Sequence, residues 1–248
     1  MKAWRFLLAP VLLLASGASA KPAIVLVHGA FANASGWDRV IAILQRDGYE
    51  AVGVEQPLLS LQGDIAATKR AIADLGEGPF VLVGHSYGGA VISGAAAGNA
   101  GVKALVFIAA IAPEAGERIN AFFGKYPAEA HSAVRQDAAG FMMIDRKRFG
   151  ALFAQDLPPT ESSVLAATQK PIRAGNFAAS LPQSAWKTLP SWYVVATKDR
   201  ALSPDLERFY AKRMGARTSE IDGGHFLFLS HPREVANVIE EAARASTK

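Results

Sequence analysis

The sequence predicts an α/β protein with a six-stranded, mainly parallel sheet, helices on both faces and an inserted helical cap. Two observations predict this class. Short apolar segments rich in β-branched residues alternate with amphipathic helical segments along the chain, which is typical of a parallel sheet buried between helices. The stretch 112–190 breaks the alternation and carries several prolines, and it is too long to be a structureless loop in a compact domain.

Strands are expected where apolar, β-prone residues run together. The segment 23–28 (AIVLVH) is continuously apolar, which indicates a strand buried on both faces. The segment 50–55 is ended by Pro57, and the segment 80–83 leads into a glycine-rich turn. Similar apolar runs place strands at 102–109 and 192–196, and the alternation with helices places a short last strand at 218–221.

Helices are expected where apolar residues recur three and four positions apart. In the first helix, at 36–47, this spacing is followed by Trp37, Val40, Ile41 and Leu44. The second helix is expected at 62–75, and its inward face should carry Ile65, Ala66, Ile72 and Leu75. Further helices are expected at 87–97, 204–214 and from Pro232 onward, where proline is tolerated in the first helical turn. The last helix has an apolar face formed by Val235, Val238, Ile239 and Ala242.

Residues 1–20 have the order of a secretory signal peptide: basic Lys2 and Arg5, a short apolar core, and Ala18-Ser19-Ala20 as a cleavage site. The alternative is a membrane anchor, but an apolar helix of about ten residues rises only ~15 Å against a hydrocarbon core of ~30 Å. We expect cleavage after Ala20 and a periplasmic or secreted protein without a membrane span. The core would comprise 21–111 and 191–248, and the cap 112–190.

The composition excludes several classes of function. The chain has no cysteine, which excludes a disulfide scaffold and a thiolate zinc site. Its formal charge of +4 is not gathered into a long basic run, and the short cluster at 146–148 follows Asp145, so a solvated helix face is favoured over nucleic-acid binding. Because no metal-binding spacing, phosphate loop or dinucleotide motif occurs, we expect no metal ion and no cofactor.

Gly84-His85-Ser86-Tyr87-Gly88 has the pattern G-x-S-x-G between an apolar strand and a helix of small residues. This is the setting of a nucleophile elbow, in which a strained turn exposes the serine hydroxyl. Glycines at 84 and 88 are needed because the backbone approaches closely there. The alternative is an ordinary glycine-rich turn. The pattern predicts Ser86 as a nucleophile.

A serine hydroxyl needs a base within hydrogen-bond reach. The chain has five histidines, and His225 lies in a loop directly after the last predicted strand. Because the carboxyl ends of parallel strands share one edge, we expect this loop to open beside Ser86. The other candidates are His28, His85, His131 and His231.

The imidazole also needs a carboxylate that fixes its tautomer. Asp199 follows the fifth predicted strand and reaches the same edge. Its competitors are Glu114, Glu117 and Asp222. The resulting chain order, Ser86, Asp199, His225, differs from that of the two best-known protease folds. For the oxyanion we expect the backbone N–H of Tyr87 and that of Ala30, with Phe31 as the next choice after Ala30.

These segments resemble the α/β-hydrolase superfamily, through VLVHGAFANASGW, VLVGHSYGGAV, VATKDRALSP and GGHFLFLSHP. More narrowly, the chain is similar to the compact branch of plant methylesterases, hydroxynitrile lyases and small bacterial esterases. The resemblance implies the α/β-hydrolase fold with a variable cap at 112–190. Lyases of that branch carry threonine after the first-strand histidine and lysine after the catalytic histidine. Here these positions are Gly29 and Phe226, which disfavours cyanohydrin chemistry.

The sequence therefore predicts a serine hydrolase that cleaves small carboxylic esters through an acyl-enzyme. An amidase or peptidase, a cofactor-free perhydrolase and a non-catalytic ligand-binding protein remain as alternatives. Cap charges are mixed, which favours a small apolar or aromatic ester as the partner molecule. The residues expected to bind it are Phe31, Phe122, Phe123, Met142, Trp186 and Phe226.

Overall fold

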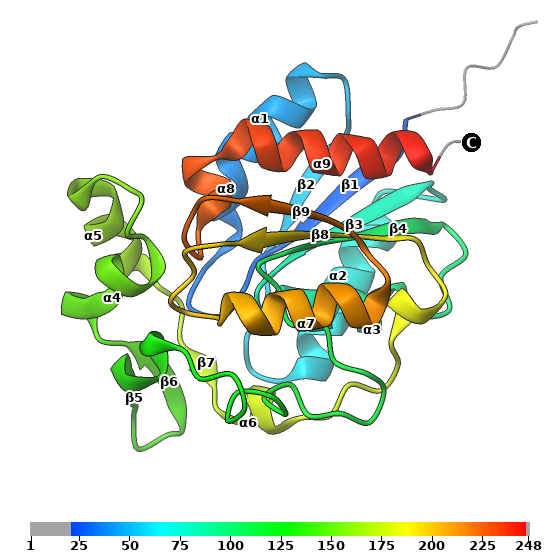
Figure 1. Cartoon of the computed structure of the whole chain (residues 1–248). Coiled ribbons are helices and arrows are strands. Elements are labelled where there is room, and N and C mark those ends of the chain that lie inside the picture. The colour runs from blue at the N-terminus through cyan, green and yellow to red at the C-terminus, as the bar shows by residue number, and fades with distance from the viewer. Residues whose placement is uncertain (1–20, 247–248) are drawn as a thin grey trace, which may run out of the picture.

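The computed structural model describes residues 21–246, and it contains a six-stranded sheet in the order β2-β1-β3-β4-β8-β9 (Figure 1). Every pair of neighbouring strands is parallel. The strands are β1 (Ala23–Val27), β2 (Ala51–Val54), β3 (Phe80–His85), β4 (Val102–Ile108), β8 (Ser191–Ala196) and β9 (Arg217–Ile221). The predicted α/β class and all six predicted strands are confirmed.

Helices cover both faces of this sheet, as predicted (Figure 1). On one face, α1 (Asp38–Arg46), preceded by the short 3₁₀ helix η1 (Ala34–Trp37), packs against α9 (Pro232–Ala245). On the other face lie α2 (Leu61–Asp74), α3 (Gly88–Ala96) and α7 (Pro204–Met214). The apolar spacing located these helices because each has one face to bury against the sheet.

The inward face of α2 differs from the prediction at one position. Leu61, Ile65 and Ile72 are buried, and Leu75 is half-buried, but Ala66 is exposed. The buried side of the helix is completed by Asp64 instead. A carboxylate on the core face of a helix cannot be expected from hydrophobic periodicity, and its partners are described below.

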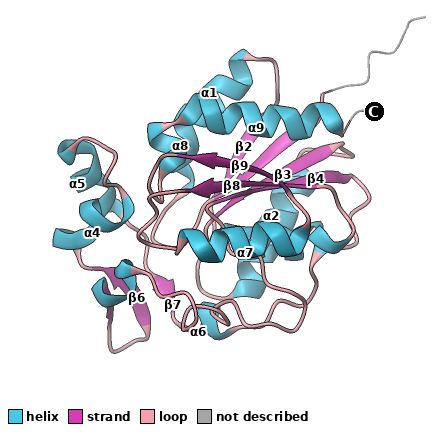
Figure 2. Cartoon of the chain, in the orientation of Figure 1, coloured by secondary structure: helices cyan, strands magenta, loops and turns pink. Residues whose placement is uncertain are grey.

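The insertion between β4 and β8 is not purely helical, which corrects the prediction. It contains an antiparallel sheet of β5 (Val134–Gln136), β6 (Phe141–Ile144) and β7 (Ile172–Arg173) (Figure 2). The hairpin before β6 closes because Asp137 accepts the Phe141 N–H at 2.9 Å and Gly140 adopts a φ of 81°. The helices of the insertion are η2 (Glu129–Ala133), α4 (Arg146–Phe153), α5 (Pro159–Thr168), α6 (Gly175–Ala178) and η3 (Ala185–Lys187).

A short helix after β9, α8 (Leu227–Ser230), was not predicted. At four residues it is too short for a periodic pattern to reveal it. The predicted signal peptide at 1–20 lies outside the described residues and stays a prediction. Over residues 21–246, no helix is long and apolar enough to cross a membrane.

Candidate active site

Ser86 lies on a sharp turn between β3 and α3. Its φ of 52° places a non-glycine residue in the left-handed region, a strain that a nucleophile elbow requires. The glycines around it are needed for space. A Cβ on Gly84 would lie 2.6 Å from the Gly88 carbonyl oxygen, and one on Gly88 would lie 2.5 Å from that of Val27. The turn therefore holds the Ser86 side chain at the edge of the sheet.

His225 and Asp199 meet beside this turn. The His225 Nδ1 lies 2.5 Å from the Asp199 Oδ2, and both side chains are buried. The second oxygen, Asp199 Oδ1, accepts the N–H groups of Ala201 at 2.6 Å and Leu202 at 2.9 Å. Asp199 follows β8 and His225 follows β9, and these parallel neighbours end at the same edge.

The Ser86 hydroxyl and the His225 ring line one cavity. Within the described part of the chain, neither the hydroxyl nor the His225 Nε2 has a hydrogen-bond partner. Bonds between a nucleophile and its base are often loose without substrate and tighten in the reacting complex. The Ser86 hydroxyl and the His225 Nε2 are therefore both free to form a hydrogen bond within the cavity.

The competing carboxylates are engaged elsewhere. Glu114 pairs with Lys187 at 2.7 Å, Glu117 with Arg213 at 2.8 Å, and Asp222 with Lys198 at 2.8 Å. These cations hold the pKa values of the exposed Glu114 and Asp222 below their usual range, chiefly through hydrogen bonds to the carboxylates.

Glu207 on α7 is a buried acid that the sequence analysis missed. It is completely buried, and its Oε2 accepts the Ala196 N–H at 2.9 Å. Burial, and then the negative charge of Asp199, raise the pKa of Glu207 well above its usual value. Burial and the neighbouring Asp199 charge therefore both favour the uncharged form of Glu207. Glu207 lies on an amphipathic helix, and the sequence pattern does not indicate that it is buried near Asp199.

Two further histidines support the site without facing the cavity. His85 donates from Nε2 to the His225 carbonyl oxygen at 3.0 Å, and its ring lies 4.6 Å from the His225 ring. His28 donates from Nδ1 to the Gly29 carbonyl oxygen at 2.8 Å and accepts the Gln56 N–H at 3.2 Å. Burial lowers the pKa of both imidazoles, so both are neutral structural groups.

The backbone near Ser86 offers free donors. Neither the Ala30 nor the Tyr87 N–H donates to any group among residues 21–246, and the Phe31 N–H is likewise unpaired. A Cβ on Gly29 would lie 2.7 Å from the Ser86 Cβ. The loop after β1 therefore runs directly against the nucleophile, as an oxyanion hole requires.

The Tyr87 side chain links the turn at Ser86 to buried polar groups of α2 and of the insertion. Its hydroxyl donates to the Asp64 Oδ2 at 2.8 Å and accepts from the Asn176 Nδ2 at 3.0 Å. Asp64 also accepts the Asn176 amide at 3.0 Å and the Leu58 N–H at 2.8 Å. All three polar side chains are buried. They connect the elbow to α2 and to α6 of the insertion.

Tyr87→Phe is expected to lower the free energy of unfolding by about 1–3 kcal/mol at pH 7, because buried Asp64 loses a donor. Burial raises the Asp64 pKa and the Tyr87 hydrogen bond opposes this. Removing the Tyr87 hydroxyl should therefore raise the Asp64 pKa further. Because a raised carboxyl pKa makes stability fall as pH rises, the loss of unfolding free energy should be larger at pH 7 than at pH 4. Denaturant unfolding at both values measures it.

The matched control for this measurement is Tyr210→Phe, because the buried Tyr210 hydroxyl has no partner among the described groups. We expect its loss to be small at both pH values. An equal loss in the two variants, or a Tyr87→Phe loss that is larger at pH 4, would contradict the role given to Asp64.

The cavity in front of Ser86 has a volume of about 320 Å³, within the range of small-molecule sites. None of the described residues that line it is Asp, Glu, Lys or Arg. Its walls include the predicted Phe31, Phe123 and Met142, together with Phe153 and Phe177. His131 also lines it and stacks on Phe123 at 5.1 Å, and burial lowers the pKa of His131. The cavity is thus aromatic and uncharged.

Three residues predicted to bind substrate do not line this cavity, which corrects the prediction. Phe122 packs on Phe209 with a ring distance of 4.9 Å. Trp186 is buried and donates its indole N–H to the Pro113 carbonyl oxygen at 3.0 Å. Phe226 is buried and packs on Phe149, with ring centroids 5.9 Å apart. Each of the three side chains packs against neighbours outside the cavity, where apolar burial is favourable in itself.

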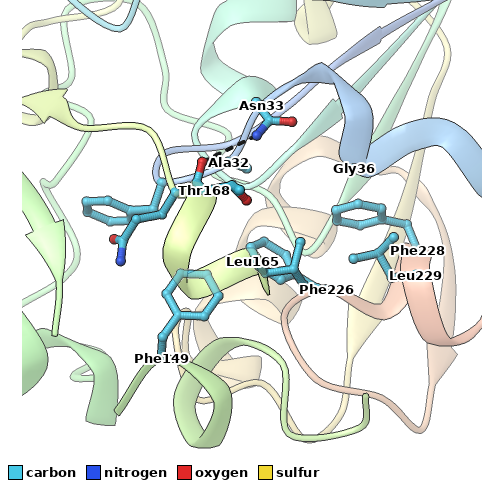
Figure 3. A pocket seen from close by; sticks show the side chains of 11 residues that line it. Ala32, Asn33, Gly36, Phe149, Leu165, Thr168, Phe226, Phe228 and Leu229 are labelled. Carbon is cyan, nitrogen blue, oxygen red and sulfur yellow. Dashed lines mark hydrogen bonds between the residues drawn. The ribbon is translucent and has the colours of Figure 1, made fainter. Parts of the chain in front are cut away.

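A second, narrow crevice of about 20 Å³ lies next to the cavity, between α4 and α5 of the insertion and α8 of the core (Figure 3). Phe149 and Leu165 reach it from the insertion, and Phe226 and Phe228 from the core. The Asn33 amide donates to the Thr168 carbonyl oxygen across it at 3.5 Å. Phe31 lines both the crevice and the cavity, so it lies where the two spaces adjoin.

Across residues 21–246 no group of three or more His, Cys, Asp or Glu side chains is arranged to hold a metal ion. The groups available for chemistry at this site are a hydroxyl on a strained turn, an imidazole–carboxylate pair, and unpaired backbone N–H groups next to the turn.

Comparisons with known proteins agree with the observed fold. The profile of the alpha/beta hydrolase family matches residues 24–238. The alpha/beta hydrolase nvfD of Aspergillus novofumigatus is 27% identical over 245 residues, covering 90% of this chain and 97% of that protein. Polyneuridine aldehyde esterase has a similar fold, with a TM-score of 0.77 and 17% identity. The match covers 90% of this chain and 99% of that protein. A pyrethroid hydrolase from Sphingobium faniae JZ-2 also has a similar fold, with a TM-score of 0.75 and 22% identity. The match covers 90% of this chain and 98% of that protein.

Proposed function

Because this chain belongs to the alpha/beta hydrolase family, we propose that it is a serine hydrolase that cleaves neutral, apolar carboxylic esters. One observation carries the proposal: Ser86 on a strained turn and His225, paired with Asp199 at 2.5 Å, line the same uncharged cavity. The fold is similar to that of an enzyme named as an esterase, which supports ester chemistry over other acyl transfers.

In the proposed reaction, the His225 Nε2 takes the proton of the Ser86 hydroxyl as its oxygen attacks the ester carbonyl. The Tyr87 and Ala30 N–H groups donate to the oxyanion that forms. His225 then gives its proton to the leaving alkoxide, so that an alcohol departs and an acyl group remains on Ser86. His225 then takes a proton from a water molecule whose oxygen attacks the acyl carbon. The bond from that carbon to the Ser86 oxygen breaks, His225 returns the proton to this oxygen, and the carboxylic acid leaves.

The cavity lining supports a neutral substrate. An ionised group would lose its hydration in a cavity without a compensating charge, which costs several kcal/mol. The aromatic side chains that line the cavity, such as Phe153 and Phe177, offer favourable surface to apolar or aromatic acyl and alcohol groups. We therefore propose small apolar esters as the substrate class.

The test is rapid-mixing kinetics with p-nitrophenyl butyrate, beside a panel of esters, lactones and amides. We expect a burst of about one p-nitrophenol per protein followed by slower turnover, because acylation precedes deacylation. Turnover of amides without turnover of esters would assign the site to an amidase or peptidase. Peracid formation from acetate and peroxide in preference to ester cleavage would assign it to a perhydrolase.

Phe31→Ala is expected to extend the accepted chain length, because Phe31 borders both the cavity and the crevice and its removal should join them. Alanine keeps the Cβ at a position with a φ of 61°, so the backbone strain is unchanged. The ratio of kcat/KM for p-nitrophenyl octanoate over butyrate should rise roughly tenfold. Steady-state kinetics with both esters measures the ratio.

Phe177→Ala serves as the control, since Phe177 lines the cavity but not the crevice. It removes a ring of the same size without joining the two spaces. If Phe177→Ala raised the ratio as much as Phe31→Ala, general enlargement of the cavity would explain the change, and removal of Phe31 would not act by joining the two spaces.

A further inference from the structure

We propose that Gln155 and Asp156, in the insertion, are positioning residues that hold the Asp199 and His225 loops in register. The inference rests on the proposed function, because these loops carry its acid and base. Both residues lie in the short link between α4 and α5, outside the cavity lining. Nothing in their sequence setting marks them as part of an active site.

Gln155 lies between the two loops. Its side-chain amide donates to the Lys198 carbonyl oxygen at 2.7 Å, one residue before Asp199. The same amide lies against Gly224, one residue before His225, where an added Cβ would be 2.5 Å from the Gln155 Nε2. A side chain at 224 would therefore displace Gln155. Gly224 has no need of a positive φ, so space alone accounts for the glycine.

Asp156 holds the histidine loop from the adjoining position. Its Oδ2 accepts the Gly224 N–H at 3.0 Å and the Ser230 hydroxyl at 2.6 Å. The Phe153 carbonyl oxygen, at the end of α4, accepts the Phe226 N–H at 3.2 Å. The insertion thus bonds to the backbone on both sides of His225.

These contacts matter because the two loops leave separate strands. The loops share one backbone hydrogen bond, from the Lys198 N–H to the Gly223 carbonyl oxygen at 3.0 Å. Residues 153–156 of the insertion add further hydrogen bonds to each loop. The short His225–Asp199 bond needs both loops in place at once. A displacement of about 1 Å in a catalytic group can lower a rate about 100-fold. The insertion therefore positions the Asp199 and His225 loops in addition to lining the cavity.

The first test compares Asp156→Ala with Asp145→Ala. Asp145 is also an insertion carboxylate with a backbone partner, Lys147 N–H at 2.9 Å, but it contacts neither loop. We expect Asp156→Ala to lower kcat for p-nitrophenyl butyrate roughly 10-fold or more, with KM nearly unchanged. Asp145→Ala should leave kcat near wild type. Asp156→Asn should restore most of kcat, because its amide oxygen can still accept both hydrogen bonds.

The second test is a double-mutant cycle between Gln155→Ala and Gly224→Ala. Each single change should lower kcat, because each removes Gln155 from its place between the loops. In the double variant the added methyl group meets no Gln155 side chain, so the two effects should be clearly less than additive. Fully additive effects would show that the two residues act independently and would overturn the contact between them as the cause.

A readout without substrate separates this inference from the proposed function. The downfield proton resonance of the His225 Nδ1–H reports its bond to Asp199 directly. We expect the signal to shift or broaden in Asp156→Ala and to persist in Asp145→Ala. Loss of ester turnover in the wild type would refute the proposed function but leave this result valid. An unchanged signal and an unchanged kcat in folded Asp156→Ala would overturn the positioning role.

Discussion

Ser86→Ala is expected to reduce kcat for p-nitrophenyl esters by roughly 10⁴- to 10⁶-fold, the range seen when a serine nucleophile is removed from a comparable triad. Alanine retains the Cβ, so the elbow with its φ of 52° should keep its geometry. Only the hydroxyl that receives the acyl group is lost. Residual activity should come from the oxyanion donors alone and should lack a burst.

Ser93→Ala is the control for this substitution. Ser93 lies on α3, is completely buried, and its hydroxyl has no partner among the described groups. Removing it should leave kcat and KM close to wild type. Retention of a few per cent of activity by Ser86→Ala, or an equal loss in Ser93→Ala, would refute Ser86 as the nucleophile.

Asp199→Asn is expected to lower kcat by roughly 10³- to 10⁴-fold at neutral pH, through the tautomer of His225. The Asp199 Oδ1 accepts two backbone N–H groups, from Ala201 and Leu202. An asparagine would place its only oxygen there and turn its NH₂ toward the His225 Nδ1. The imidazole would then carry its proton on Nε2, where it cannot accept a proton from Ser86.

Asp222→Asn is the matched control, because Asp222 lies three residues before His225 and pairs with Lys198 on the surface. We expect its kcat to stay within about twofold of wild type, since exposed ion pairs contribute little. Measuring kcat/KM across pH for both variants distinguishes them. A comparable loss in Asp222→Asn would mean that the wrong carboxylate has been assigned.

The strands, and the positions of Ser86, Asp199 and His225 at their ends, could be predicted from the sequence because the signals are local. Apolar runs mark buried strands, and a parallel sheet brings the residues after β3, β8 and β9 to one edge. Ser86 directly follows β3, and Asp199 and His225 lie in the loops that follow β8 and β9. Their approach to one another thus followed from topology, without any knowledge of side-chain packing.

The residues around them could not be located in this way. Phe122 and Trp186 are aromatic members of the insertion, like Phe123, but packing against Arg213 and Pro113 takes them away from the cavity. Glu207, Asp64 and Gln155 act through tertiary contacts at sequence separations that no periodic pattern encodes. The short strands of the insertion form because they pair with one another, which a single segment does not reveal.

The most direct test of the central claim is the mass of the protein quenched during turnover of p-nitrophenyl butyrate. The account predicts a population heavier by one butyryl group, with the added mass on the peptide that contains Ser86, and no such population in Ser86→Ala. Ester turnover with no acylated protein at any quench time, or with the acyl group on another residue, would contradict it.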